Sequence, residues 1–269
     1  METHLNMHAT PPQPGGADYI TGIIASLMDD ITSYYRRLTP PQRLLVGIAL
    51  VAILFYVYQT IAENPATLIA RMIVLVVAFT IHEFSHAWMA DYFGDMTPRD
   101  MGRLTLNPLK HLDPLGSLLL LTSGFGWAKP VQVNPLVLYQ ASPSAMMWVA
   151  LAGPVSNLLL ALIGAIPFQF NLVEAASAAS TGFLPSPGFL LTEFIWINLI
   201  LMLFNLLPIA PLDGEKVAMH LLPPAGQDVL NRLRPYSFLL LFGLIFLFPS
   251  FLGVLIGAPA NFLLNLLVQ

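Results

Sequence analysis

The chain has 269 residues, of which 56% are hydrophobic and only 10% are charged, and its formal net charge is −4. A soluble domain carries about 25% charged residues, so this composition favours an integral membrane protein built of helices. The small net charge and the lack of a basic stripe argue against a nucleic-acid partner. The chain has no cysteine, which excludes disulfides and cysteine-ligated zinc and leaves His, Asp and Glu as candidate metal ligands.

The N-terminal part of the chain precedes the first long apolar run. Pro and Gly cluster near the end of residues 1–16, which predicts a disordered tail. Residues 17–38 carry isoleucine and leucine at helical spacing and could form an amphipathic helix. We therefore expect residues 1–40 to form a tail with an amphipathic helix, separate from a membrane-embedded domain at 41–269.

Four apolar runs are each long enough to cross a membrane as a helix. They cover about 44–61, 67–92, 145–168 and 188–207. The last apolar stretch, 236–269, could form one span with an interfacial helix, or two short spans broken at Pro249-Ser250. The sequence thus predicts an all-α polytopic membrane protein with about five to six transmembrane helices.

The segment 93–143 is too polar to cross the membrane as one helix. Residues 124–133 begin with glycines and then alternate weakly, which suggests an extended element or a small β-hairpin at the membrane edge. The apolar piece 115–121 is too short to span and could be re-entrant or interfacial.

Lys and Arg are distributed asymmetrically between the loops. They gather before the first span, between the second and third spans, and after the fourth, whereas the loop between the third and fourth spans has none. By the positive-inside rule, the N-terminus and the segment 93–143 face the cytoplasm. The C-terminal ends of the second and fourth spans then lie at similar depth, towards the cytoplasmic side of the cell membrane.

The second apolar run contains His82-Glu83-Phe84-Ser85-His86. On a helix, His82 and His86 share a face and can bind one ion, and a catalytic zinc holds three protein ligands and a water. Glu83 neighbours the first ligand and can act as a general base. Two histidines four residues apart also occur by chance in soluble helices. Polar groups inside a membrane are costly and usually functional, which favours a metal site here.

Two histidines need a third ligand. The candidates in or beside apolar segments are Asp213, Asp91, Glu193, His220 and Glu174. Similar depth favours Asp213, and Pro208 and Pro211 prevent a regular helix there, so that the backbone can bend towards the metal. The alternative is a helix-ending turn in which Asp213 caps the next helix.

Three sets of residues occur in order along the chain. They are the His82–His86 motif, Gly153-Pro154 with Asn157, and the pair Asn205-Leu206-Leu207-Pro208 and Pro211-Leu212-Asp213-Gly214. Together they resemble the site-2 protease family of intramembrane zinc metalloproteases. Residues 124–131 also look like the edge-strand or re-entrant hairpin of that family. The resemblance covers about 67–235, and no PDZ domain follows the third span, so the chain looks like a compact member.

The resemblance implies that residues 41–269 form a zinc metalloprotease domain with its core at about 67–235. One Zn²⁺ would be held by His82, His86 and Asp213, with Glu83 as the general base. Asn205 would donate a hydrogen bond to the oxyanion or orient Glu83, although a helix–helix hydrogen bond is an equal alternative for it. Asn157 is expected to support the site rather than to act in catalysis.

The substrates that the resemblance implies are transmembrane helices of other proteins, which must unwind before hydrolysis. An edge strand can pair with such an unwound segment by β-augmentation, and residues 124–134 are the candidate here. Gly124, Phe125 and Gly126 are therefore predicted to bind substrate, with an ordinary interfacial loop as the alternative for this region. A membrane transporter or metal-handling protein that uses the buried His and Asp residues is the alternative function. The lipid bilayer is an expected partner, and the oligomeric state is left open.

Overall fold

The computed structural model describes residues 65–113, 116, 128–174 and 183–268, together with Thr21, Ala25, Thr39 and Pro40. The chain divides into two compact units, Met1–Phe55 and Tyr56–Gln269, and every helix named below belongs to the second. The predicted tail and amphipathic helix, the first span at 44–61 and the piece 115–121 lie outside the described residues except for these few positions.

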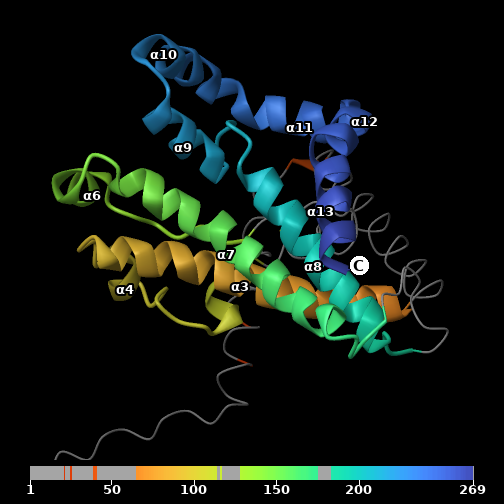
Figure 1. Ribbon diagram of the computed structural model, residues 1–269. Coiled ribbons are helices and arrows are strands. Elements are labelled where there is room, and N and C mark those ends of the chain that lie inside the picture. The colour runs from red at the N-terminus through yellow and green to blue at the C-terminus, as the bar shows by residue number, and fades with distance from the viewer. Residues whose placement is uncertain are drawn as a thin grey trace, which may run out of the picture. The chain divides into compact units, whose positions relative to one another are not determined.

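The described part of the chain is built of helices (Figure 1). Three are long: α3 (Pro65–Tyr92), α7 (Ala145–Gln169) and α8 (Pro187–Asn205). The shorter ones are α4 (Thr97–Asp100), η1 (Pro108–Lys110), α6 (Pro135–Ala141), α9 (Asp213–Leu221), α10 (Pro224–Leu233), η2 (Arg234–Tyr236), α11 (Ser237–Leu247), α12 (Pro249–Leu252), η3 (Gly253–Gly257) and α13 (Ala258–Val268).

Five helical stretches among the described residues are long and apolar enough to cross a membrane. They are Pro65–Tyr92, Ala145–Gln169, Pro187–Asn205, Pro224–Leu247 and Pro249–Val268. The first three match the predicted spans at 67–92, 145–168 and 188–207 to within two residues. The prediction of an all-α polytopic membrane protein is therefore confirmed.

The C-terminal stretch forms two spanning-length segments rather than one. Phe248 leaves helical geometry, with φ −127° and ψ 48°, and α12 starts at Pro249. Proline has no N–H to continue the helical hydrogen-bond ladder of α11, which explains the break at this position. The first of the two segments also begins at Pro224, earlier than the expected 236, because α10 and η2 lead directly into α11.

Helices α3, α7 and α8 pack against one another, α9 packs on α7, and α13 lies along α8 (Figure 1). Where α7 and α8 meet, α7 presents small buried residues, Ala161, Gly164 and Ala165. A side chain at Gly164 would lie 2.8 Å from the ring of Phe194. Small residues let membrane helices approach closely, and this approach fixes the helices that carry the site.

The expected hairpin at 124–133 is described only from Ala128 onward. Within the described residues, Leu112 and Ala128 form an isolated antiparallel bridge, and the N–H of Lys129 donates to the carbonyl of His111 at 2.8 Å. The chain then runs without regular structure to Asn134, whose side chain caps α6 by accepting from Leu136 N.

Candidate active site

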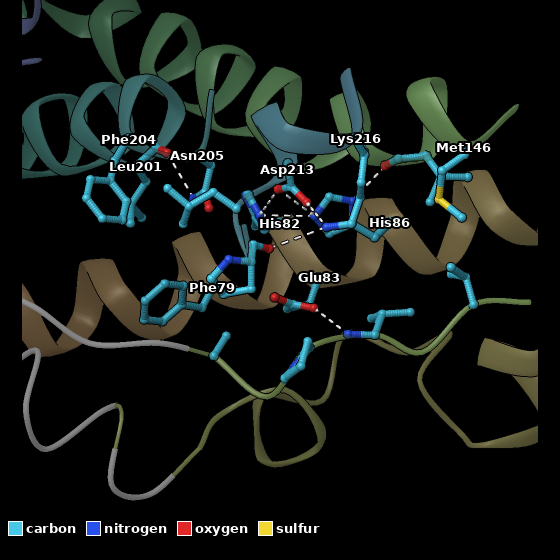
Figure 2. A pocket seen from close by; sticks show the side chains of 18 residues that line it. Phe79, His82, Glu83, His86, Met146, Leu201, Phe204, Asn205, Asp213 and Lys216 are labelled. Carbon is cyan, nitrogen blue, oxygen red and sulfur yellow. Dashed lines mark hydrogen bonds and ion pairs between the residues drawn. The ribbon is translucent and has the colours of Figure 1, made fainter. Parts of the chain in front are cut away.

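Three potential metal ligands from two helices point towards one another (Figure 2). His82 and His86 lie one turn apart in the second half of α3, and Asp213 is the first residue of α9. Oδ2 of Asp213 lies 3.2 Å from Nε2 of each histidine, and the two Nε2 atoms lie 3.1 Å apart. All three side chains are largely buried, with the histidines 5% and 8% exposed.

These separations fit a single zinc ion. Two ligand atoms at about 2 Å from zinc and at a tetrahedral angle lie about 3.3 Å from each other. The three distances here, 3.1, 3.2 and 3.2 Å, are close to that value. Two imidazoles and one carboxylate are also a usual ligand set for catalytic zinc, in which the fourth position stays open.

The other ring nitrogen of each histidine is held by α7. Nδ1 of His86 donates to the carbonyl of Val149 at 2.7 Å, because a backbone carbonyl can only accept. Nδ1 of His82 lies 2.5 Å from Oδ1 of Asn157. Contacts of this kind orient metal-binding histidines and keep Nε2 free for the ion.

The position of Asp213 follows from the sequence before it. Leu212 is extended, with ψ 158°, and α9 starts directly after it. A side chain at Gly214 would collide with the backbone carbonyl of Leu206, so only glycine lets α9 start this close to the end of α8. Burial alone would raise the pKa of Asp213, but the facing imidazoles of His86 and His82 lower it below its usual value. A lowered pKa favours the deprotonated carboxylate that metal binding requires.

Glu83 lies beside the ligands and is 7% exposed. Its Oε2 accepts a hydrogen bond of 3.0 Å from the N–H of Val131, in the extended segment 128–133 (Figure 2). Arg103 holds this segment from behind, because its guanidinium donates to the carbonyls of Lys110 and Lys129. The carboxylate is thus fixed between α3 and the extended segment.

A cavity of about 300 Å³ opens at the three ligands and Glu83. Its polar lining also includes Asn205 and Lys216, whose Nζ lies 3.7 Å from Oδ1 of Asp213. Most other lining side chains are apolar: Phe79, Val131, Val133, Met146, Leu201 and Phe204. A largely apolar pocket with a few convergent polar groups is typical of a binding or catalytic site.

The remaining third-ligand candidates lie elsewhere. Asp91 pairs with Arg99 at 2.7 Å and Glu193 pairs with Arg71 at 3.2 Å. Glu174 and His220 are exposed. Among the described residues, only Asp213 joins the two histidines in a group that could hold a metal.

The other predicted site residues fall into two groups. Asn205 lines the cavity from the last turn of α8, and its Nδ2 donates to the carbonyl of Leu201 within the same helix at 3.0 Å. Gly124, Phe125 and Gly126 lie outside the described residues. Sequence reasoning missed Arg103, which looked like one of several loop cations but is only 5% exposed. Its burial and its hydrogen bonds to the carbonyls of Lys110 and Lys129 distinguish Arg103 from the other loop cations, and these appear only in the structure.

Comparison with known proteins identifies relatives that share most of the chain. "Putative zinc metalloprotease YwhC" of Bacillus subtilis (strain 168) is 42% identical over 193 residues, which cover 69% of this chain and 84% of that protein. "Putative zinc metalloprotease Rip2" of Mycolicibacterium smegmatis (strain ATCC 700084 / mc(2)155) is 33% identical over 61% of this chain and 62% of its own length. The protein of that name from Mycobacterium tuberculosis (strain ATCC 25618 / H37Rv) is 30% identical over 68% of each chain.

No protein-family model and no solved structure matches the chain. The assignment therefore rests on these relatives together with the buried group of His82, His86 and Asp213. Both indicate zinc chemistry, and the chain belongs to the zinc metalloprotease family represented by YwhC and Rip2.

Proposed function

We propose that this protein is an intramembrane endopeptidase of the site-2 protease type, which hydrolyses peptide bonds within or near transmembrane segments of other proteins. One observation carries the proposal. Glu83 and the three ligands share one cavity, and Glu83, His82 and His86 belong to a helix of 28 residues that is apolar enough to cross a membrane. A hydrolytic site on such a helix is suited to substrates that lie in the bilayer.

The proposed mechanism uses His82, His86 and Asp213 to hold zinc and Glu83 to move a proton. When bound, zinc supplies a Lewis acid that polarises the scissile carbonyl and lowers the pKa of a bound water to about 7. Glu83 accepts a proton from the attacking water at its carboxylate and returns it to the leaving amine nitrogen. The Val131 N–H engages Oε2, which leaves Oε1 for the proton.

Asn205 and the extended segment 128–134 are proposed to handle the substrate. The amide of Asn205 keeps one N–H beyond its bond to Leu201, and this N–H can stabilise charge that develops on the scissile carbonyl oxygen. The extended segment contributes Ala128, Pro130 and Val131 to the cavity wall. An unwound substrate could pair with this segment as an added strand, together with the undescribed residues 124–126.

We further propose that the site faces the cytoplasmic side of the cell membrane. The proposal rests on the Lys and Arg residues of the segment 93–143, which mark it as cytoplasmic. This segment begins directly after α3, only a few residues beyond His86, so the site lies near the same side. Metal transport, the alternative function, would need polar sites in series across the bilayer. Among the described residues there is one cluster that could hold a metal, which favours proteolysis.

The test compares the wild-type protein with Glu83→Gln and Asp213→Ala in lipid vesicles. The probe is a single-span reporter protein tagged at both ends, with zinc content measured beside cleavage and the cut site located by mass spectrometry. We expect about one zinc per chain in the wild type and in Glu83→Gln, cleavage only in the wild type, and neither in Asp213→Ala.

Three results would overturn parts of this proposal. Cleavage by Glu83→Gln at the wild-type rate would show that Glu83 is not the general base. A cut far outside the reporter's transmembrane segment would show that the protein is not an intramembrane endopeptidase. Zinc uptake into vesicles that survives Glu83→Gln, with no cleavage by the wild type, would favour the transport alternative.

A further inference from the structure

A row of hydrogen bonds runs from the metal site through α7 into α8. Oδ1 of Asn157 lies 2.5 Å from Nδ1 of His82, and Nδ2 of Asn157 donates to Oδ1 of Asn198 at 2.8 Å. Nδ2 of Asn198 then donates to the carbonyl of Phe194, one turn earlier in α8, at 2.8 Å. Both asparagines are fully buried, at 0% exposure.

The direction of this row is fixed at its far end. The carbonyl of Phe194 can only accept, so Asn198 must turn its nitrogen to it and its oxygen to Asn157. Asn157 must then donate to Asn198 and present its own oxygen to His82. An amide oxygen cannot donate, so the hydrogen between these two residues sits on Nδ1 of the imidazole. Nε2 of His82 is left with its lone pair towards Asp213.

We propose that Asn198 is a positioning residue for the metal centre, which sets the tautomer of His82 through Asn157. Without Asn198, the amide of Asn157 can rotate and present its nitrogen to His82, and two donors would then face each other or the ring would change tautomer. The proposal rests on the His82–His86–Asp213 metal site and is independent of where the protein cuts its substrates.

A purely structural role for Asn198 predicts a different outcome. Buried asparagines also hold membrane helices together by hydrogen bonds between them, and the bond between Asn157 and Asn198 joins α7 to α8. Loss of such a bond lowers stability but does not change the intrinsic affinity for metal. The two roles are therefore separated by a measurement of zinc affinity on folded protein.

The experiment measures zinc affinity in detergent by competition with a chelator, for the wild type, Asn198→Leu, Asn198→Asp and Thr192→Val. Asn198→Leu removes the acceptor for Asn157 at similar volume. Asn198→Asp keeps an acceptor oxygen towards Asn157 in either protonation state. Thr192→Val is the matched control, because its hydroxyl bonds within α8 to the carbonyl of Gly188.

We expect Asn198→Leu to bind zinc about tenfold more weakly, at the low end of the loss caused by removal of groups that support metal-bound histidines. Asn198→Asp and Thr192→Val should bind zinc like the wild type. Unchanged affinity in Asn198→Leu would overturn the proposal, as would an equal loss in Asn198→Asp. A wild type that binds no zinc would instead refute the metal site itself.

A second measurement covers the case in which Asn198→Leu does not fold. Nitrogen NMR of zinc-loaded wild-type protein with labelled histidines, assigned by single histidine substitutions, reports which ring nitrogen of His82 carries the proton. We expect a proton on Nδ1 and zinc on Nε2. A proton-free Nδ1 on His82 would overturn the row's direction, and with it the role of Asn198.

Discussion

Gly153 of α7 lies directly against the imidazole of His82: a Cβ atom at this position would lie 2.6 Å from both Cε1 and Nε2 of the ring. Real Cβ atoms do not approach other atoms this closely. Nε2 of His86 is closer still to the same point. The absence of a side chain at this one position therefore makes the space that the two rings occupy.

We predict that Gly153→Ala abolishes zinc binding at micromolar zinc. The methyl group must displace both rings, because α7 and α3 are packed and cannot separate cheaply. Zinc content of purified protein checks this. Gly243→Ala is the control, since a Cβ at Gly243 meets nothing within 4 Å, and it should bind zinc normally. Zinc retained by Gly153→Ala would mean that the rings do not occupy these positions.

Arg103 should matter for cleavage but not for zinc. Its guanidinium donates to two carbonyls, of Lys110 and Lys129, and a lysine ammonium cannot reproduce this planar, two-pronged geometry. We expect Arg103→Lys to lower the cleavage rate at least about tenfold, because Glu83 loses its fixed partner at Val131. The control, Arg99→Lys, changes an exposed arginine paired with Asp91. Loss of zinc in Arg103→Lys would contradict this division of roles.

We predict that the protein becomes less stable as the pH is lowered, because of His111. This side chain is fully buried, its Nε2 donates to the carbonyl of Thr105 at 2.7 Å, and Nδ1 has no hydrogen-bond partner among the described residues. Burial lowers the pKa of His111 below 6.5. The unfolded chain therefore binds a proton that the folded protein does not, and stability decreases as pH falls through 6.5.

The test is thermal unfolding of metal-free protein at two pH values, about one unit above and one below the ordinary histidine pKa of about 6.5. His111→Gln keeps a donor for Thr105 but does not titrate, so its melting temperature should drop less than that of the wild type. His220→Gln alters an exposed histidine and should follow the wild type. Equal drops in all three proteins would exclude His111 as the source.

Glu215 and Arg234 tie α9 to the turn before α11. Glu215 is 6% exposed, and its Oε1 accepts from both Nε and Nη2 of Arg234. Arg234→Met leaves the buried carboxylate unpaired, which we expect to lower the free energy of unfolding by about 1–3 kcal/mol. Arg232→Met, at an exposed position, is the control. Denaturant unfolding measures both, and equal stabilities would show that Glu215 needs no partner.

The sequence predicted the parts of the site that follow from local spacing. His82 and His86 share a face because the helix has 3.6 residues per turn, and the apolar run predicted at 67–92 is long enough to cross a membrane as a helix. Asp213 was predicted as the third ligand from the similar depth of the ends of the second and fourth spans, and from Pro208 and Pro211, which stop the helix. Helix periodicity, the positions of prolines and the depth of the helix ends were enough for these residues.

Asn198 could not be assigned a role in the same way. Its partner Asn157 lies 41 residues away, and which faces of α7 and α8 meet depends on packing that periodicity does not encode. The mostly apolar surface of both helices also obscures which face is buried. A polar residue within a span indicated that Asn198 has a role, but the sequence does not show which residue it contacts.

The hydrogen bond from the Val131 N–H to Oε2 of Glu83 has a consequence for the order of events when a substrate binds. The extended segment that lines the cavity is also the neighbour that steadies the proposed base. A guest strand that displaces this segment would also break its hydrogen bond to Glu83. Glu83 would then be held by the extended segment in the empty site and released from it when a substrate binds.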